Sequence, residues 1–324
     1  MDIISIIIPS HNRHDLLGKC IFSILKQRNA CYEIIIVDNG SCEKFVPIVA
    51  SPQIRYIRLD RNEGFSKAVN IGIKEAKGKY IAILNNDTEL DNCWIDNIFK
   101  AFAENPDILF ITSKIIRYNN REMIDDVGNI ILPYGKVYKI GYNERDNGQY
   151  KKARVVFGAS GAASAFRREF FEIVGFFDED FFAYLEDIDL SFRANLLGLK
   201  CLYVPDAVVY HIGSATTGST YNKFTVYYLG RNTFNVIVKN FPARLILLNF
   251  FKILAFFCAL QLFFFIKGLG GCYFRGIISA AGMLKRMIEK RKYIMKNRII
   301  SDIELIRILQ DNYKIYRLSK SNKE

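Results

Sequence analysis

Three short clusters of acidic and amide side chains in this 324-residue chain could bind a metal ion or accept a proton. In the first cluster, Asn85, Asn86 and Asp87 come directly after the apolar run at residues 80–84. Oxygen donors at this spacing can share one Mg²⁺ or Mn²⁺ that also binds a diphosphate. A plain turn is the alternative interpretation, because Asn and Asp both favour turns.

The second cluster, Glu186 to Asp189, lies in the first turns of a predicted helix that begins near Tyr184 and ends near Gly198. Its apolar residues share one helical face, and Asp189 and Arg193 stand four residues apart, as an ion pair within a helix does. Glu186 and Asp187 have no such partner within the helix, so they are candidates for a general base. The alternative is that these acids only complement the helix dipole.

The third cluster is Asp38 with the turn residues after the apolar run at 33–37. Asp38 could accept a hydrogen bond from a base N–H or a ribose hydroxyl, or it could cap the Asn-Gly turn. The first apolar run leads into residues 9–13, Pro-Ser-His-Asn-Arg, which lack the glycine-rich loop of dinucleotide-binding and ATP-binding folds. His211 follows another strand-like run, and a lone histidine there is usually just a hydrogen-bonded residue.

Short β-branched runs position these clusters. They recur at residues 3–8, 33–37, 54–59 and 80–84, with helical apolar stripes between the first and second and between the third and fourth. This alternation predicts an α/β fold of the nucleotide-binding type, in which ligands bind at the carboxyl ends of the strands. Farther along the pattern loosens, and residues 118–150 are interpreted as a loop-rich insertion without assignable elements.

Apolar and aromatic side chains dominate residues 221–284. Within this region residues 245–266 are long and apolar enough to cross a bilayer, but they include Asn249, Lys252 and Gln261, and basic residues flank both ends. We therefore predict a helical segment that lies in the membrane interface. A single transmembrane helix is the second interpretation, and a buried pair of core helices is the third.

The net charge of +12 comes from 45 basic and 33 acidic residues and favours anionic partners. Residues 285–324 hold 12 basic and 5 acidic residues, a net +7. Because this tail adjoins the apolar region, we expect it to meet an anionic membrane surface at the cytoplasmic face, and no nucleic acid. A solvated helix face is the alternative for its last twenty residues. The seven scattered cysteines form no Cys-x-x-Cys pair and are expected to be reduced thiols.

Five segments, taken in order, resemble the inverting family 2 glycosyltransferases, and within them the rhamnosyltransferase-like branch that builds bacterial surface polysaccharides. The resemblance covers about residues 3–213 and implies the GT-A type of α/β fold, with a mixed, mostly parallel central sheet flanked by helices, here followed by a C-terminal helical membrane-associating extension. The segments are Ile6 to Arg13 (IIIPSHNR), Val37 to Ser41 (VDNGS), Asn62 to Gly72 (NEGFSKAVNIG), Leu84 to Thr88 (LNNDT), and Gly175 to His211, which contains YLEDIDLSFR.

The same resemblance implies a reaction and its nucleotide site. The donor would be a dTDP-sugar or UDP-sugar, and its sugar, rhamnose or a similar hexose, would pass to a hydroxyl of a glycan or a lipid-linked glycan. Asp38 would read the uracil or thymine base. Asn62, Gly64 and Asn70 would shape the loop under the ribose and diphosphate, or form a plain turn into a helix. The other residues expected in the nucleotide site are Ser10, Asn12, Arg13 and Asn86.

The resemblance also implies a divalent metal, Mg²⁺ or Mn²⁺, and a catalytic base. Asn85 to Asp87 match the D-x-D metal motif, where Asp87 would bind the metal and Asn85 replaces the first acid. We therefore expect weaker metal affinity than a full motif gives. His211 matches a position where relatives supply a further metal ligand. Asp187 matches the catalytic base, with Glu186 beside it at the mouth of the site.

We expect a catalytic domain over residues 1–220, with a nucleotide-binding half at 1–105 and an acceptor and catalytic half at 106–220. The apolar region 221–284 and the basic tail 285–324 follow. Two other functions stay open. A sugar nucleotidyltransferase needs a glycine-rich basic loop, which the turn after the first strand does not supply. A degenerate glycosyltransferase retained as a subunit of a membrane complex is consistent with the missing acid of the D-x-D motif.

Overall fold

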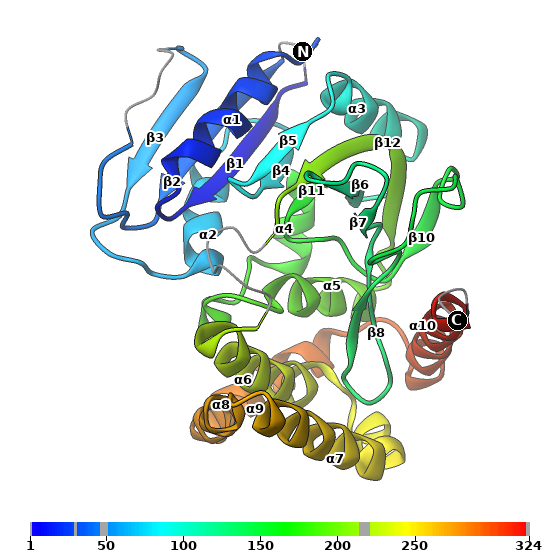
Figure 1. Ribbon diagram of the computed structural model, residues 1–324. Coiled ribbons are helices and arrows are strands. Elements are labelled where there is room, and N and C mark those ends of the chain that lie inside the picture. Colours follow the sequence, from blue (N-terminus) through cyan, green and yellow to red (C-terminus); the bar gives the residue numbers. More distant parts are fainter. Residues whose placement is uncertain (1, 29–30, 46–50, 214–220, 322–324) are drawn as a thin grey trace.

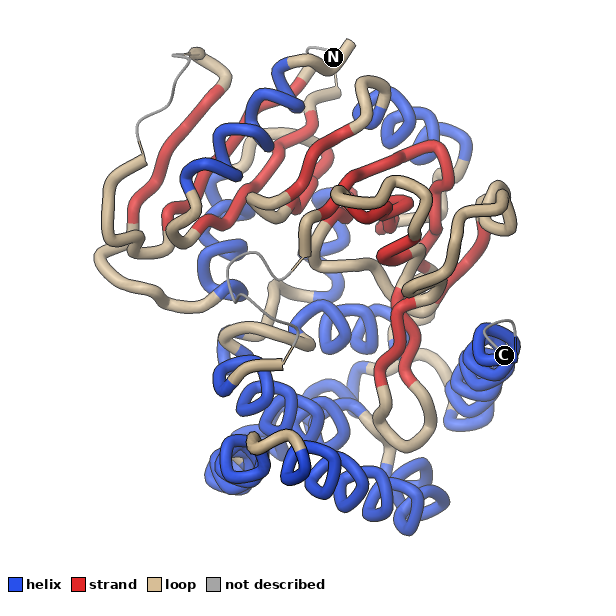
Figure 2. Tube along the Cα trace, viewed as in Figure 1, coloured by secondary structure: helices blue, strands red, loops and turns tan. Residues whose placement is uncertain are grey.

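A ten-stranded sheet with helices on both faces forms the centre of the computed structural model, which describes residues 2–28, 31–45, 51–213 and 221–321 (Figures 1 and 2). Its main path is β10-β12-β6-β11-β4-β1-β2-β3, and all of these strands except β10 and β11 run in one direction. The predicted α/β fold with a mixed, mostly parallel sheet is confirmed. The strands are β1 (Ile4–Ser10), β2 (Tyr32–Asp38), β3 (Ile54–Arg58), β4 (Tyr80–Leu84), β5 (Thr88–Leu90), β6 (Phe110–Arg117), β7 (Ile124–Asp126), β10 (Arg154–Val156), β11 (Ala163–Arg167) and β12 (Cys201–His211).

Alternate residues of β1 face opposite sides of the sheet. Ile6 and Ile8 pack in the same cluster as α1 and α3, whereas Ile7 packs with α2, α4 and α5. Because both faces are covered, the strand is a continuous apolar run, which is why the first four strands are legible in the sequence. The helices of this domain are α1 (His14–Leu25), α2 (Phe65–Glu75), α3 (Trp94–Glu104), α4 (Arg168–Val174) and α5 (Glu186–Leu196), with a 3-10 turn η1 (Glu179–Phe181) before α5.

The insertion at residues 118–150 forms short strands, and its centre, residues 124–132, is buried. β7 pairs with β6, while β8 (Asn129–Ile131) and β9 (Val137–Lys139) form a separate hairpin. Ile124 and Ile130 are fully buried in the main core. Strands of three residues are too short to show a periodic pattern, so the sequence could not assign them.

Within the described residues 221–321, five helices follow the strands of the main sheet (Figure 1). α8 and α9 pack on α6, α7 packs on α8, and α10 returns to the insertion, where Asn312 Nδ2 donates to the carbonyl of Ile131 at 3.0 Å. The expected domain boundary at residue 220 and the last three residues of the tail lie outside the described residues. The helices are α6 (Lys223–Asn240), α7 (Ala243–Ile266), α8 (Gly270–Gly282), α9 (Leu284–Asn297) and α10 (Asp302–Ser321).

Helix α7 contains the apolar segment and is, among the described residues, the one helix long and apolar enough to cross a membrane. Leu245, Asn249 and Phe264 are its buried residues, whereas Leu247 and Phe251 are 76% and 81% exposed. The third interpretation, a pair of buried core helices, is wrong for this segment, because almost none of its most apolar stretch is covered by protein. Its position in or on a membrane stays a prediction.

Candidate active site

The carboxyl ends of β1, β2, β4 and β12 carry the predicted site residues. Ser10 ends β1, Asp38 ends β2, residues 85–87 follow β4, and His211 ends β12. Ser10 and Asp38 are register partners, and β12 pairs with β5 so that His211 lies opposite Thr88. Because these four strands run in one direction, residues far apart in the chain gather at a single edge of the sheet.

Asp87 and His211 are the potential metal ligands at this edge. His211 Nε2 lies 3.2 Å from Asp87 Oδ1, and both side chains are buried. Apart from this contact with Asp87, the Nε2 atom has no hydrogen-bond partner within the described residues. A buried ring nitrogen that faces a carboxylate fits two side chains that could share a divalent cation.

Asp125, on β7, contacts the other side of the imidazole. His211 Nδ1 donates to Asp125 Oδ2 at 2.9 Å, and Lys139 Nζ donates to the same oxygen at 3.2 Å. Burial lowers the pKa of His211, but the hydrogen bond to Asp125 and the nearby Asp87 outweigh burial and raise it to about 9. A carboxylate bound to the second nitrogen of a metal-binding histidine fixes the orientation of the ring.

The turn that carries Asp87 is fixed through its main chain. The N–H of Asn85 donates to the carbonyl of Ala162 at 3.0 Å, and the carbonyl of Asn85 accepts from Thr88 Oγ1 at 2.7 Å. Within the described residues no group of three or more His, Cys, Asp or Glu side chains is placed to hold a metal ion. Whether Asn85 contacts a metal therefore stays a prediction, and Asp87 with His211 is the pair brought together.

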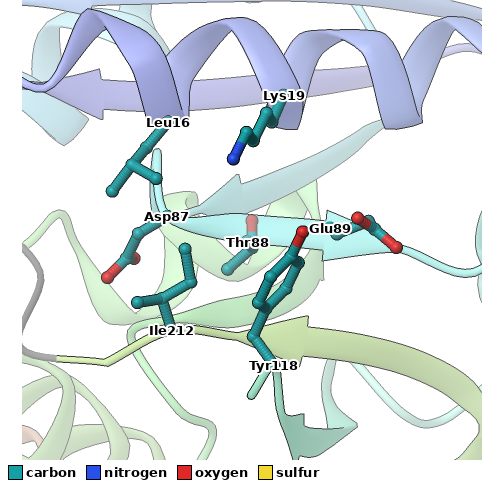
Figure 3. Close-up of a pocket in the computed structure, with 7 residues that line it drawn as sticks. All are labelled: Leu16, Lys19, Asp87, Thr88, Glu89, Tyr118 and Ile212. Atoms are coloured by element: carbon teal, nitrogen blue, oxygen red, sulfur yellow. The ribbon is translucent and has the colours of Figure 1, made fainter.

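A small pocket lies beside Asp87, between α1, β5 and the residues that follow β12 (Figure 3). Its volume of about 10 Å³ is room for roughly one water molecule, so it is too small for a nucleotide. It is lined by Leu16, Lys19, Asp87, Thr88, Glu89, Tyr118 and Ile212.

Asp187 stands at the N-terminus of α5, oriented by three donors. Its Oδ2 accepts from the N–H of Gly161 at 3.0 Å and from Asn129 Nδ2 at 3.1 Å, and its Oδ1 accepts from the N–H of Ile188 at 2.8 Å. Burial raises the pKa of the Asp187 carboxyl, and the N–H groups of Gly161 and Ile188 oppose this rise. A carboxylate held in this way has a defined direction and an increased tendency to accept a proton.

Glu186 lies in a different environment from its neighbour. It is 7% exposed, and its Oε2 has no hydrogen-bond partner. Burial, and then the charge of Asp187, raise the pKa of Glu186 well above its ordinary value. The two adjacent acids therefore lie in different surroundings, since Asp187 accepts from three donors whereas Glu186 Oε2 accepts from none within the described residues.

Asp38 is buried at the end of β2. Its Oδ1 accepts from the N–H of Ser41 at 3.0 Å, its Oδ2 accepts from the hydroxyl of Tyr56, and Arg58 Nε lies 3.9 Å away. Burial alone would raise the pKa of Asp38. The hydrogen bonds from Ser41 and Tyr56 have the larger effect, so the pKa is lowered overall. The N–H of Asn12 donates to Ser41 Oγ at 2.8 Å and joins this turn to the one after β1. The contact of Asp38 with a nucleotide base stays a prediction.

Ser10 and Asn86 meet at the same edge, because Asn86 Nδ2 donates to Ser10 Oγ at 3.0 Å. Arg13 follows in a turn with a φ of 55° and pairs with Asp15 at 3.1 Å near the surface. The structure therefore brings Ser10 and Asn86 together beside Asp87. The guanidinium of Arg13 bonds Asp15 and is close enough to Asp87 for the charge of that carboxylate to help raise the pKa of Arg13.

Asn62 and Gly64 shape the loop before α2, whereas Asn70 lies within α2 and fixes the segment after α4. Asn62 Oδ1 accepts from the N–H of Gly64 at 3.0 Å. Gly64 has a φ of 91°, and a Cβ there would lie 2.7 Å from the ring of Phe182, so glycine is required. Asn70 Nδ2 donates to the carbonyl of Phe177 at 2.9 Å, and its Oδ1 accepts from the N–H of the same residue at 3.0 Å. Their contact with ribose or diphosphate stays a prediction.

Two residues of the site, Asp125 and Asn129, were missed in the sequence. Both come from the insertion at residues 118–150, and each contacts a predicted site residue, His211 or Asp187. The signal that could have found Asp125 is a pair of adjacent acids between apolar residues, since such acids are rarely buried without a partner.

Comparison with known proteins gives the family. The sequence profile described as Glycosyl transferase family 2 matches residues 5–175, just over half of the chain. The chain is 25% identical over 228 residues to the poly-beta-1,6-N-acetyl-D-glucosamine synthase of Staphylococcus epidermidis, covering 68% of this chain and 52% of that one. It is 27% identical over 231 residues to the O-antigen biosynthesis protein RfbC of Myxococcus xanthus, covering 66% and 17%. The chain thus spans about half, or less, of the length of these relatives.

Solved structures agree in fold. The chain is similar to GalNAc-T7, solved with UDP, GalNAc and Mn²⁺, with a TM-score of 0.59 and 19% identity over 74% of this chain and 49% of that one. It is also similar to the mannosyltransferase PcManGT from Pyrobaculum calidifontis, solved with GDP-Man and Mn²⁺, with a TM-score of 0.53 and 15% identity over 91% and 87%. These likenesses support the predicted GT-A fold. The profile match, which covers more than half of the chain, shows that this chain belongs to glycosyl transferase family 2.

Proposed function

We propose that this protein is an inverting glycosyltransferase that moves a sugar from a nucleoside-diphosphate donor to a hydroxyl of a glycan or lipid-linked glycan in surface polysaccharide synthesis. The observation that carries the proposal is the strand edge itself, where Asp87 and His211 form a buried pair and α5 presents an oriented carboxylate, Asp187. The resemblance to the rhamnosyltransferase-like branch favours dTDP-rhamnose or a UDP-sugar as the donor.

In the proposed mechanism the acceptor hydroxyl attacks the anomeric carbon while the bond from that carbon to the diphosphate oxygen breaks. The hydroxyl proton passes to Asp187 Oδ1 or Oδ2, and the bonding electron pair leaves with the nucleoside diphosphate. Because the displacement is direct, the anomeric configuration inverts and no protein nucleophile takes part. Asn129 and Gly161 keep the carboxylate pointed at the acceptor, since both donate to Asp187 Oδ2.

The residues at the edge of the sheet fit a divalent metal. Asp87 and His211 would hold it, because His211 Nε2 and Asp87 Oδ1 face each other at 3.2 Å and both side chains are buried. Bound Mg²⁺ or Mn²⁺ would supply positive charge to the leaving diphosphate. The two similar solved proteins that contain Mn²⁺ support this assignment. Asn85 in place of an acid makes the site less negative, which favours modest affinity.

Asp125→Asn is expected to weaken Mn²⁺ binding about 10- to 100-fold, because second-sphere partners of metal-binding histidines have effects of this size. The amide oxygen can still accept from His211 Nδ1–H and Lys139, which both bond Asp125 Oδ2, but it lacks the negative charge that the carboxylate places beside the imidazole. Calorimetric titration with Mn²⁺ measures the change. Asp126→Asn is the matched control, since this buried neighbour accepts from the N–H of Gly128 instead. Equal affinities in both variants would contradict the assignment.

The experiment that tests the proposed function is a thermal-shift screen of nucleoside diphosphates and nucleotide sugars, each with and without Mn²⁺. We expect stabilisation by uridine or thymidine diphosphates that grows when Mn²⁺ is present, since ligands that bind the folded state raise its melting temperature. If none of the nucleotides stabilises the protein, the donor assignment is lost.

We further propose that α7 docks on the cytoplasmic face of the membrane, where a lipid-linked acceptor would be found. Its exposed side carries Leu247, Leu248, Phe251 and Leu262, each more than 60% exposed. An apolar face of this extent is typical of a surface that meets lipid or protein. After α8, helix α9 carries basic residues. Arg286 and Lys290 pair with Asp178 and Asp180, so Lys285, Lys292 and Lys296 are the ones that anionic headgroups would attract.

The double variant Leu247→Glu/Phe251→Glu is expected to lower binding to anionic liposomes at least tenfold, because two apolar side chains that would enter the lipid become charged. Co-sedimentation with anionic and neutral vesicles measures the effect. Phe22→Glu, an exposed apolar residue on α1, is the control and should bind as the unaltered protein does. Membrane docking by α7 would be ruled out if the double variant sedimented like this control.

The second candidate function, a degenerate glycosyltransferase that serves as a complex subunit, rests on Asn85 at the first position of the metal motif. A transferase slowly hydrolyses its donor with water as the acceptor, whereas a subunit without activity does not. Release of nucleoside diphosphate from the donor panel distinguishes the two.

A further inference from the structure

We propose that Asn232, on α6, is a positioning residue that holds the segment before α5 in the conformation that aims Asp187. The inference rests on the proposed function and deepens it. In this inference α6 helps to set the direction of the Asp187 side chain. The sequence of α6 gives no reason to expect such a role.

The segment before α5 has an unfavourable backbone. Phe182, Tyr184 and Leu185 have φ values of 62°, 68° and 65°, in the left-handed region that large side chains rarely adopt. Leu185 is the N-cap of α5 and makes no side-chain cap hydrogen bond. Such a conformation persists only where surrounding groups impose it.

Asn232 supplies that constraint. Its Nδ2 group lies within hydrogen-bond distance of three carbonyls of this segment, those of Phe181 at 3.0 Å, Ala183 at 2.8 Å and Tyr184 at 2.6 Å. The side chain is fully buried. The Asn232 Nδ2 group has two hydrogens, so the three carbonyl oxygens share them and all point toward this one nitrogen. The turn is therefore shaped around this single side chain.

Arg231 supports the same contact. Its Nε donates to Asn232 Oδ1 at 2.9 Å, which fixes the amide so that its N–H groups face the segment. A second guanidinium nitrogen donates to the carbonyls of Phe181 at 2.6 Å and Asp180 at 2.8 Å. Neighbouring residues of α6 thus hold successive carbonyls of one turn.

The held segment connects both halves of the proposed site. On one side the carbonyl of Phe182 accepts from the N–H of Ser66 at 3.2 Å, next to Gly64 of the predicted donor loop. On the other side Glu186 and Asp187 follow directly on Leu185 as the first residues of α5. A change of φ at Tyr184 or Leu185 would rotate the start of the helix and turn the Asp187 carboxylate away from its direction.

The test compares Asn232→Ala with Asn235→Ala in the full chain. Both asparagines are fully buried on α6, but Asn235 Nδ2 contacts Met283 Sδ at 3.6 Å and not the segment before α5. We expect Asn232→Ala to lower kcat for nucleoside-diphosphate release at least 100-fold, with the donor KM and nucleotide Kd within threefold of the unaltered protein. Asn235→Ala should keep kcat within threefold.

Hydrogen exchange provides a readout independent of activity. The amides of residues 181–188 are expected to exchange at least tenfold faster in Asn232→Ala, and to be unchanged in Asn235→Ala. If Asn232→Ala does not fold, Asn232→Ser, which keeps one donor, takes its place with the same expectations. Unchanged exchange and unchanged kcat would overturn the inference, as would equal losses in both variants. If the unaltered protein turns over no donor, the proposed function fails, while the exchange data still decide whether Asn232 holds the segment.

Discussion

Asp187→Asn is expected to lower the rate of sugar transfer about 10²- to 10⁴-fold, the range that a positioned general base contributes, while nucleotide binding is retained. The amide keeps nearly the same shape and can still accept from the N–H of Gly161 or Ile188, but it cannot take a proton from the acceptor. Single-turnover rates and the Kd for the nucleoside diphosphate measure the two parts separately.

Glu186→Gln is the control for this variant. Burial and the charge of Asp187 raise the pKa of Glu186, which favours the neutral carboxyl, and an amide resembles a neutral acid. We expect its rate to fall less than tenfold. If Glu186→Gln abolished transfer and Asp187→Asn did not, the base would be Glu186 and the assignment would be reversed.

Asp189→Ala is expected to lower the free energy of unfolding by about 3–5 kcal/mol, because removal of one partner leaves buried charges uncompensated. Asp189 is fully buried and accepts from Arg193 Nε at 3.0 Å, from Lys239 Nζ at 2.8 Å and from Asn240 Nδ2 at 2.8 Å. It therefore joins α5 to α6. Denaturant unfolding, followed by fluorescence, measures the loss.

The exposed pair of Asp311 and Lys314 on α10 provides the control for this prediction. Its side chains are 57% and 74% exposed and lie 2.8 Å apart. Surface pairs contribute about 0–1 kcal/mol, so Asp311→Ala should change the free energy of unfolding by no more than that. An equal, small effect of both substitutions would show that the Asp189 cluster does not stabilise the packing of α5 on α6.

The sequence made the sheet edge predictable because its strands are continuous apolar runs. Ile6, Ile7 and Ile8 are all buried although they face alternate sides of the sheet. Each such run ends at a polar residue, and these residues lie together because the strands run in one direction. The predicted i,i+4 pair of Asp189 with Arg193 is also confirmed. It could be predicted because it depends only on the spacing of residues within one helix.

The supporting contacts could not be predicted, because their partners lie far apart in the chain. Asp125 and His211 are 86 residues apart, and Asn129 and Asp187 are 58 apart. In the same way Asn232 stands in a region predicted from its composition as apolar and membrane-associating, yet α6 directs buried polar side chains to the segment before α5. Periodicity describes one helix or strand, and it carries no information on which turn that element contacts.

The measurement that tests the central claim most directly is nucleoside-diphosphate release from a panel of dTDP- and UDP-sugars, with Mn²⁺ and bacterial lipid extract as the source of acceptor. The unaltered protein is predicted to release the diphosphate from at least one donor, more slowly without Mn²⁺, and Asp187→Asn is predicted to bind that donor without releasing it. Release from no donor, or equal release by both proteins, would contradict an inverting transferase that uses Asp187 as its base.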